Sequence, residues 1–391
     1  MKKYGLIGKK LNYSYSKIIH DFLIAEYSVN ATYDLIELES INKDILLEYD
    51  GLNVTIPYKE EVLQYLDDNI AKMPVNTIMK IHTQLIGYNT DIDGFEYLVK
   101  NIKIADINKV VILGSGASSK MIQAYFKDKE VIVVSRDDKV NNYQNLKNLH
   151  ADLLINTTPI GVNEYASPIN EEYLTNFHGI IDLNYNPINS KLALDCRKND
   201  INFIGGLDML LKQAVKSFQI WHGFIVDNNT YQRLKAHVLS QTQPKIALIG
   251  LSLSGKTTII KKYHGVDLDE EIESKYQENI TNMLENNVFR ERETIILKEL
   301  VNGNKKLVAC GGGIVLKHEN MELLKDYLII HLTADIETLK ERLSNEKRPL
   351  IQDEKQLIEM NNERQKLYKK YANIELNQEE LEGFLNETSN H

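Results

Sequence analysis

The stretch IALIGLSLSGKTT, residues 246–258, carries the most specific pattern for chemistry in this sequence. A short apolar run leads into the spacing G-x-x-x-x-G-K-T, in which backbone N–H groups cradle nucleotide phosphates. The lysine of this pattern reaches the β- and γ-phosphates, and the threonine hydroxyl binds Mg²⁺. The predicted phosphate-binding residues are Gly250, Ser254, Gly255, Lys256 and Thr257.

Two acids and three glycines follow this loop. VDLD places Asp267 and Asp269 two residues apart, so at a strand end both carboxylates face one side. One is suited to hydrated Mg²⁺ and the other to an acceptor hydroxyl. LVACGGGIV places three glycines after a buried strand, where only glycine allows a ligand to approach the backbone closely. These are Gly311, Gly312 and Gly313.

Three arginines are further candidate ligand-binding residues in the back half of the chain: Arg290 in VFRERE, Arg348 in KRPLI and Arg364 in NERQKLYKKYA. Two converging arginines form a bidentate carboxylate clamp, and one on a mobile, proline-containing lid neutralises charge on a transferring phosphoryl group. The pattern predicts phosphoryl transfer to an acceptor that has a hydroxyl and a carboxylate.

An acid–base pair is predicted in the front half. In GLNVTIPYK, residues 51–59, an extended strand would place apolar and polar side chains on opposite faces, and Pro57 favours a strand end that leaves Lys59 on a loop. Asp91 lies in a turn in YNTDIDGF. A lysine near an aspartate moves a hydroxyl proton as a hydride leaves the adjacent carbon. The apolar face would carry Leu52, Val54 and Ile56, and the polar face Asn53, Thr55 and Lys59.

A second glycine-rich turn, in VVILGSGASS at 110–119, predicts a dinucleotide site with Gly114 and Gly116. The next strand-like run ends in Arg136, and an arginine there holds a 2′-phosphate, which favours NADP. Asp137 beside it would repel that phosphate, so NAD stays open as an alternative.

The secondary structure that must position these residues is predicted to be of the α/β class. Short apolar runs alternate with helical patterns throughout, which is typical of α/β folds with helix-covered parallel sheets. A boundary is expected at Thr242–Lys245, where a helical stretch ends before a new strand, and a softer one near residue 100. We therefore expect three domains: 1–100, completed by helices at about 207–240; 101–206; and 245–391.

Composition narrows the function classes. With 43% apolar and 26% charged residues and a net charge of −9, the chain has a globular composition and no basic stripe for nucleic acid. It contains no run of about 20 apolar residues, so we expect neither a membrane span nor a membrane partner. We expect the chain to be cytoplasmic. The two cysteines, Cys196 and Cys310, are expected to be buried, unpaired thiols without zinc spacing.

The front half resembles the shikimate dehydrogenases. S-x-S at Ser14 and Ser16, NVTIPYK, VNT, NTD with GF, GSGAS, SRD, INTTPIG, DLNYNP and GLDMLLKQA occur in that family's order. The resemblance implies that Lys59 and Asp91 are the catalytic pair. It also implies that Ser135 and Arg136 contact NADP and that Gly206 and Met209 lie near the nicotinamide. The implied shikimate-binding residues are Ser14, Ser16, Thr55, Asn76 and Gln213.

The back half, from 245 to about 372, resembles shikimate kinase in its P-loop, D-x-D, F-R-x-x-E, triple glycine, R-P-L and R-x-x-x-Y. The resemblance implies ATP with Mg²⁺, Asp267 at the metal, Arg348 on the lid and Arg342 against adenine. Asp269, Arg290, Arg364 and the three glycines would bind shikimate. Gly-Glu before Phe-Arg is replaced here by Glu285 and Asn286.

The sequence therefore predicts two consecutive reactions on one chain. NADP-dependent reduction of 3-dehydroshikimate to shikimate would precede ATP-dependent phosphorylation of shikimate to shikimate 3-phosphate. Two alternatives remain open: a back half that binds nucleotide as a regulatory module without catalysis, and a front half that oxidises quinate or shikimate with NAD.

Overall fold

The structure is a computed structural model that describes residues 1–11, 14–70, 74–136, 141–162, 165–345, 351 and 353–389. The predicted lid arginine, Arg348, and the acid beside the cofactor arginine, Asp137, lie outside these residues. The chain divides into two compact units, Met1–Gln241 (unit 1) and Thr242–His391 (unit 2), each described here by itself.

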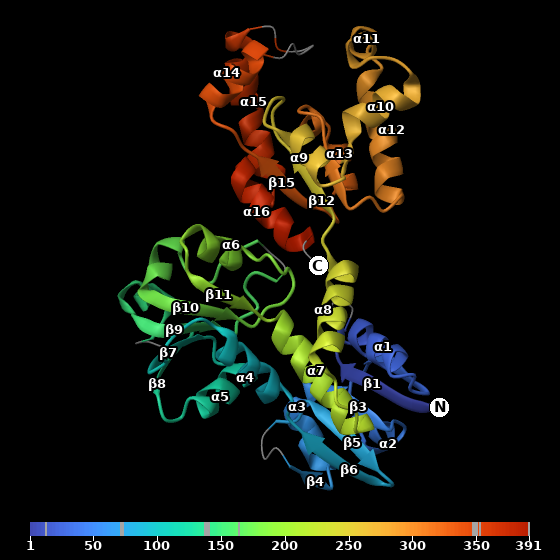
Figure 1. Ribbon diagram of the computed structural model, residues 1–391, viewed down its shortest axis with the longest axis vertical. Helices are drawn as coiled ribbons and strands as arrows, with labels where there is room; N and C mark the ends of the chain where they lie inside the picture. Colours follow the sequence, from blue (N-terminus) through green and yellow to red (C-terminus); the bar gives the residue numbers. More distant parts are fainter. Residues whose placement is uncertain are drawn as a thin grey trace. The chain divides into compact units, whose positions relative to one another are not determined.

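Unit 1 begins with a six-stranded mixed sheet of order β2-β1-β3-β5-β6-β4 (Figure 1). The prediction of parallel sheets is wrong for this one, because β5 is antiparallel to both β3 and β6. The antiparallel pairing of β5 with β6 follows from their connection, since residues 82 and 83 alone join them and so short a link forms a hairpin. The elements are β1 (Lys2–Gly8), α1 (Ser16–Glu26), β2 (Ala31–Glu37), α2 (Lys43–Leu47), β3 (Gly51–Val54), α3 (Tyr58–Glu61), η1 (Val62–Tyr65), β4 (Asp68–Asn69), β5 (Thr77–Ile81) and β6 (Gln84–Tyr88).

The second sheet of unit 1 is five-stranded and parallel, of order β11-β10-β9-β7-β8. In Figure 1 the two sheets form separate lobes, with α4 and α7 between them. The elements are α4 (Asp91–Asn101), β7 (Lys109–Leu113), α5 (Ala117–Tyr125), β8 (Glu130–Val134), η2 (Tyr143–Asn148), β9 (Ala151–Asn156), η3 (Glu171–Asn176), β10 (Phe177–Asp182), α6 (Lys191–Lys198), β11 (Asn202–Gly205), α7 (Leu207–His222) and α8 (Asn228–Thr242).

Helix α7 packs closely on the first lobe. A Cβ added at Gly94 would lie 2.5 Å from the Met209 carbonyl oxygen, and one at Gly51 would lie 2.4 Å from Trp221 Nε1. The Trp221 indole also donates a hydrogen bond to the Ile78 carbonyl at 2.9 Å. Glycines in α4 and β3 thus allow α7 to reach the mixed sheet, which brings late residues of unit 1 to early ones.

The strand at 51–59 is shorter than predicted. It ends at Val54, and both Val54 and Asn53 are buried, whereas Ile56 is 72% exposed. The polar face is buried because α7 covers it, and Ile56 is exposed because it lies beyond the strand end. Lys59 lies in the short helix α3 rather than on a loop.

Unit 2 is built on a parallel five-stranded sheet of order β13-β14-β12-β15-β16. Because β12 is central, the loop at its carboxyl end lies beside the ends of β14 and β15. The elements are β12 (Ile246–Ile249), α9 (Lys256–Lys262), β13 (Val266–Asp267), α10 (Leu268–Tyr276), α11 (Ile280–Glu285), α12 (Phe289–Asn302), β14 (Leu307–Ala309), η4 (Ile314–Leu316), α13 (His318–Leu323), β15 (Leu328–Leu332), α14 (Ile336–Asn345), α15 (Glu354–Tyr371), β16 (Ile374–Leu376) and α16 (Gln378–Ser389).

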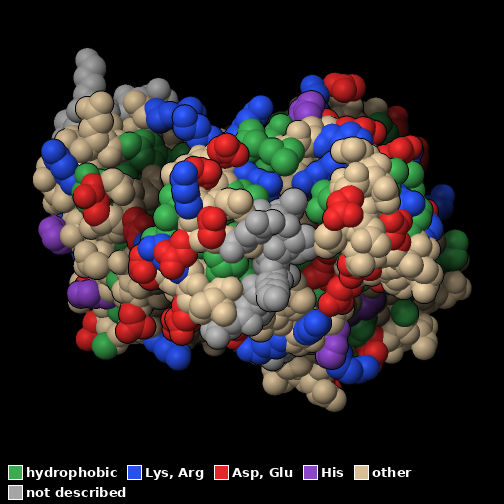
Figure 2. Space-filling view, turned by 90° about the horizontal axis from the view of Figure 1, so that it is seen from above, with side chains coloured by type: hydrophobic (Ala, Val, Ile, Leu, Met, Phe, Trp, Pro, Cys, Tyr) green, Lys and Arg blue, Asp and Glu red, His purple; other side chains and the backbone are tan. Residues whose placement is uncertain are grey.

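The surface is of mixed charge. Among the described residues visible in Figure 2, acidic and basic side chains are interspersed rather than gathered in one broad basic stripe. None of the helices in the described ranges combines the length and the apolar character that a bilayer crossing requires. Both cysteines are buried free thiols.

Candidate active sites

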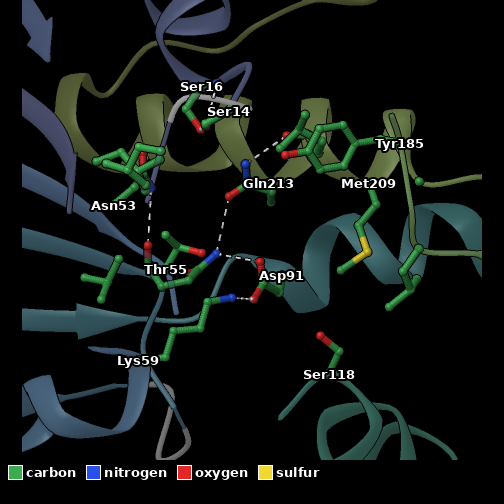
Figure 3. A pocket seen from close by; sticks show the side chains of 17 residues that line it. Ser14, Ser16, Asn53, Thr55, Lys59, Asp91, Ser118, Tyr185, Met209 and Gln213 are labelled. Carbon is green, nitrogen blue, oxygen red and sulfur yellow. Dashed lines mark hydrogen bonds and ion pairs between the residues drawn. The ribbon is translucent and has the colours of Figure 1, made fainter. Parts of the chain in front are cut away.

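A cavity of about 190 Å³ in unit 1 collects residues from both of its lobes. The mixed sheet, α1 and the first residue of α4 contribute lining residues, and so do α5, the turn before α7 and the first half of α7 (Figure 3). Nine predicted residues line it together: Ser14, Ser16, Thr55, Lys59, Asn76, Asp91, Gly206, Met209 and Gln213.

The predicted acid–base pair is in contact. Lys59 Nζ lies 2.5 Å from Asp91 Oδ2, and the two side chains are 22% and 19% exposed. Figure 3 shows them facing each other in the cavity. Partial burial reduces screening of this ion pair by salt, and the ammonium group remains available to a ligand oxygen.

Asn76 is oriented by its surroundings. Its Oδ1 accepts the Thr90 backbone N–H at 2.7 Å, so its Nδ2 donates to Asp91 Oδ1 at 2.8 Å. The same Nδ2 lies 3.3 Å from Gln213 Oε1. Asn76 therefore connects the aspartate of the pair to α7.

The two serines lie at the start of α1. Ser14 Oγ is 3.1 Å from Ser16 Oγ and accepts the Ser16 backbone N–H at 3.2 Å. The amino end of a helix favours an anionic group, because free N–H groups and the helix dipole both point to it. This end of the cavity fits a carboxylate.

The predicted dinucleotide residues lie at the carboxyl edge of the parallel sheet. Gly114 has φ +101°, and a Cβ there would lie 2.7 Å from Thr157 Oγ1. Gly116 precedes α5 and has open space around it, which suits close approach of a pyrophosphate. Ser135 and Arg136 follow β8, where Arg136 is exposed. A Cβ at Gly206 would lie 2.1 Å from the Leu183 carbonyl oxygen.

The sequence-based interpretation missed two polar residues that line this cavity, Ser118 and Tyr185, and Asn53, which was predicted on the polar face of the strand, lines it as well. Tyr185 packs edge-on against Tyr15, with ring centroids 5.3 Å apart. It lies in DLNYNP, a motif already noted as similar to the family, so the signal was present. Ser118 directly follows the GSGA turn.

In unit 2 the lysine of the predicted phosphate-binding loop forms hydrogen bonds with the backbone of the same loop. Lys256 Nζ donates to the carbonyls of Gly250 and Leu251, both at 2.8 Å. Gly250 and Gly255 have φ values of +144° and +102°, which favour glycine. Phosphate oxygens would replace the carbonyls as partners of the ammonium group.

Thr257 and Asp267 meet as the metal prediction requires, with Thr257 Oγ1 donating to Asp267 Oδ2 at 2.8 Å. Within the described ranges, no group of three His, Cys, Asp or Glu residues is placed to hold a metal. A hydroxyl and one carboxylate fit Mg²⁺, which keeps several waters and takes its remaining ligands from phosphates.

The triple glycine accommodates the chain's own side chains. A Cβ at Gly311 would lie 2.7 Å from Asp269 Oδ1, and one at Gly313 would lie 2.0 Å from Arg290 Nη2. The Gly312 carbonyl accepts the Tyr368 hydroxyl at 2.5 Å. The expectation that only a ligand approaches this backbone is thus incomplete, since the glycines also let Asp269 and Arg290 lie against it.

The surroundings of Asp269 raise the pKa of its carboxyl group. Burial, with the nearby negative charges of Asp267 and Glu293, raises its pKa to about 7, while Lys256 and Arg290 oppose the shift. Its Oδ1 is buried and has no hydrogen-bond partner among the described residues. A carboxylate with this pKa and a free oxygen is suited to accept a hydroxyl proton near neutral pH.

The arginines converge on a fully buried acid. Arg290 Nη1 donates to both oxygens of Glu293, at 2.7 and 2.9 Å. Burial raises the pKa of Glu293, and the charges of Arg290 and Arg364 both lower it, so both guanidinium groups act on the same carboxylate. Arg342 lies elsewhere, donating to the Leu253 carbonyl of the phosphate loop at 2.8 Å.

Known proteins match both units. Residues 6–78 match the family described as shikimate dehydrogenase substrate binding domain, and residues 253–386 match the family described as shikimate kinase. The shikimate dehydrogenase (NADP(+)) of Clostridium beijerinckii is 36% identical, in an alignment that covers 60% of this chain and 97% of that protein.

Two solved structures are similar to the front part of the chain. Shikimate dehydrogenase 1 from Peptoclostridium difficile has a TM-score of 0.55 and 33% identity, covering 61% of this chain and all of that one. A chorismate mutase/shikimate 5-dehydrogenase fusion protein from Clostridium acetobutylicum has a TM-score of 0.58 and 30% identity, with coverages of 62% and 98%. The chain therefore belongs to the shikimate dehydrogenase family and carries a shikimate kinase domain behind the dehydrogenase on the same polypeptide.

Proposed function

We propose that unit 1 reduces 3-dehydroshikimate to shikimate with NADPH and that unit 2 phosphorylates shikimate to shikimate 3-phosphate with ATP. The observation that carries the first step is the Lys59–Asp91 contact of 2.5 Å in a cavity that also holds Ser14, Ser16 and Gln213. The second step is supported by Asp269, whose unpartnered oxygen faces the glycine backbone beside Arg290.

In the first reaction, NADPH supplies a hydride to the carbonyl carbon. The ammonium group of Lys59 donates a proton to the carbonyl oxygen, which becomes the hydroxyl of shikimate. Asp91 holds the lysine in place and accepts from the substrate hydroxyl next to it. Ser14 and Ser16 bind the substrate carboxylate, and Thr55, Asn76 and Gln213 bind its hydroxyls.

The cofactor of unit 1 is held by the parallel sheet. Gly114 and Gly116 admit the pyrophosphate, Ser135 and Arg136 contact the 2′-phosphate, and Gly206 and Met209 border the nicotinamide. NADP is favoured because Arg136 is exposed at the strand end and the Clostridium beijerinckii relative is named for NADP(+).

In the second reaction, the γ-phosphoryl group passes from ATP to the shikimate hydroxyl, and ADP leaves. Thr257 and Asp267 would hold Mg²⁺, which would neutralise phosphate charge. Asp269 takes the proton from the shikimate hydroxyl that attacks the γ-phosphorus. Arg290 and Arg364 bind the shikimate carboxylate, with Gly311, Gly312 and Gly313 beneath the ring. Lys256 contacts the transferring phosphoryl group, joined by Arg348 from the lid, and Arg342 borders the adenine.

We also propose three functional domains: a shikimate-binding domain at 1–100, completed by helices at about 207–240; a dinucleotide domain at 101–206; and a kinase domain at 245–391. Each proposed domain contains one of the three sheets: the mixed sheet, the parallel sheet of unit 1 and the sheet of unit 2, in that order.

The direct test is mass spectrometry of the products formed by the purified chain with 3-dehydroshikimate, NADPH and MgATP. Shikimate 3-phosphate is the expected product. Shikimate without phosphate would reject the second step, and unchanged 3-dehydroshikimate would reject the first. Replacing NADPH by NADH at low concentration tests the cofactor, and omitting ATP shows whether shikimate is released.

A further inference from the structure

We propose that Ser217 is a positioning residue for the reduction site. This inference rests on the proposed function of unit 1. Ser217 lies in α7, one turn after Gln213, and its side chain is completely buried. It lines no part of the cavity, so it acts on the substrate only through other residues.

The hydroxyl of Ser217 joins α7 to two strands and to the residue that precedes α4. It donates to the Gln213 carbonyl at 3.0 Å, which leaves its oxygen free to accept. Asn53 Nδ2 donates to it at 2.9 Å, and Thr77 Oγ1 lies 2.7 Å away. Thr90 Oγ1 is 3.3 Å away. A single hydroxyl thus contacts β3, β5 and the residue that precedes α4.

A hydrogen bond from Tyr33 fixes the orientation of the Asn53 side chain. Its Oδ1 accepts the Tyr33 hydroxyl at 2.8 Å, so its Nδ2 must face Ser217. Tyr33 is fully buried and stacks on His20 with ring centroids 4.1 Å apart. The amide that meets Ser217 is therefore held by a rigid, buried support.

The contacts of Ser217 lead to the acid–base pair in two further steps. Thr90, one of its partners, donates its backbone N–H to Asn76 Oδ1 and accepts from Asn76 Nδ2 at 3.0 Å. Asn76 Nδ2 in turn donates to Asp91 Oδ1, and Asp91 is paired with Lys59. Ser217 therefore sets the distance between Gln213, on its own helix, and the groups that carry out proton transfer.

Hydrogen bonding, rather than volume, is what Ser217 contributes. Its alanine variant would remove the shortest contact of Asn53 Nδ2, at 2.9 Å, and of the Thr77 hydroxyl, at 2.7 Å. Only the longer contacts of these two groups, at 3.1 to 3.3 Å, would then remain, so the surrounding side chains must shift to strengthen them. Small displacements of groups that position a substrate cost about ten- to a hundredfold in rate. A cysteine at 217 fills the space but is a weak hydrogen-bonding group, so it separates the two contributions.

The test measures steady-state reduction of 3-dehydroshikimate by the full-length chain and three variants: S217A, S217C and, as a matched buried serine outside the cavity, S190A. We expect S217A and S217C to lower the catalytic efficiency of this reduction by about ten- to a hundredfold, with the KM for NADPH unchanged. S190A should retain the wild-type efficiency. Kinase turnover on the same chain provides the concentration of folded unit 2.

Three results would overturn the inference: wild-type catalytic efficiency in S217A, full activity in S217C, or an equal loss in S190A. If S217A does not yield a folded unit 1 by circular dichroism, Thr77→Val decides, because it removes one of the same hydrogen bonds from the opposite side. Wild-type turnover is measured first. Its absence would reject the proposed function, whereas its presence with an unaffected S217A rejects only the role of Ser217.

Discussion

The two candidate sites differ in how much of their polar chemistry is already satisfied. In unit 1, Asp91 is held by Lys59 and Asn76, and Asn76 is held by Thr90. In unit 2, Asp269 has an oxygen without a partner among the described residues, and Lys256 is bound to the loop's own carbonyls. The polar groups of the unit 1 site are paired before a ligand arrives, whereas those of the unit 2 site have bonds to exchange when one binds.

This difference follows from the two chemistries. A proton and a hydride must reach adjacent atoms in one geometry, so a fixed pair of acid and base is useful. Phosphoryl transfer depends on charge stabilisation around a ligand that brings its own negative charge, so the cations of the site change partners. Each substitution below acts on one of the two sites and leaves the other as an internal reference.

The largest effect is expected from Lys59→Met, which removes the proposed proton donor of unit 1. We expect the turnover rate for reduction of the 3-dehydroshikimate carbonyl to fall by about 10²–10⁴-fold, measured by NADPH absorbance. Kinase turnover should be unchanged. Lys80→Met is the control, because Lys80 lies in β5 of the mixed sheet and its Nζ donates to the Leu47 carbonyl. Equal losses in both lysine variants would contradict a catalytic role.

A smaller but still large effect is expected from Gly313→Ala. The added Cβ would lie 2.0 Å from Arg290 Nη2 and displace the guanidinium from the backbone. The KM for shikimate should rise by about tenfold or more in a coupled kinase assay, with the KM for ATP unchanged. Gly383→Ala in α16, where an added Cβ meets nothing within 4 Å, should have no effect. An unchanged KM for shikimate in Gly313→Ala would argue against Arg290 as its ligand.

Arg136→Ala tests the cofactor contact in unit 1. Loss of one charged contact to a phosphate is expected to raise the KM for NADPH by about tenfold and to leave the KM for NADH unchanged. Lys129→Ala, a cation at the opposite end of β8, is the matched control. A parallel rise for both dinucleotides would mean that Arg136 does not recognise the 2′-phosphate.

The smallest effect concerns stability. Because the pKa of Asp269 is raised to about 7 in the folded chain from an ordinary 3.8, the carboxyl group contributes stability at low pH that is lost as pH rises through 7. Asp269→Asn should therefore raise the thermal midpoint of unit 2 by a few degrees at pH 8 and change it little at pH 4. Kinase activity should be lost at both values. Calorimetry showing a lower midpoint at pH 8 would contradict the raised pKa.

The control for this measurement is Asp335→Asn. The Thr338 backbone N–H lowers the pKa of Asp335, so this carboxylate contributes stability above its ordinary pKa that is lost as pH falls. Its removal should not raise the midpoint at pH 8. Opposite responses from two acids of one unit would separate the Asp269 effect from a general loss of negative charge.

Much of both sites could be predicted because their chemistry lies in local patterns. The loop at Gly250–Thr257 and the acids of VDLD were predicted from neighbours in sequence, and the structure brings them together. The ends of elements were harder, since the strand at 51–59 was expected to bury Ile56 and instead stops at Val54. A turn-favouring proline marks a boundary only to within a few residues.

Contacts between distant segments could not be predicted from the sequence. Glu293 ends the motif F-R-x-x-E, but only the fold shows that its side chain is fully buried and accepts a hydrogen bond from Asn320, 27 residues later in the sequence. Ser217 is likewise one small residue in a helix, and its partners Asn53 and Thr77 are more than a hundred residues away in sequence. Periodicity indicates which face of a helix is buried but not which polar groups it meets.

The connection between the two units has a consequence for the cell. Only residues 243–245 separate the last residue of α8 from the first of β12. So short a connector offers a protease few extended residues to cleave, and neither unit is supplied without the other. The ratio of the two activities is therefore set by translation of a single message rather than by the balance of two genes, and any mutation that reduces the yield of the chain lowers both activities in step.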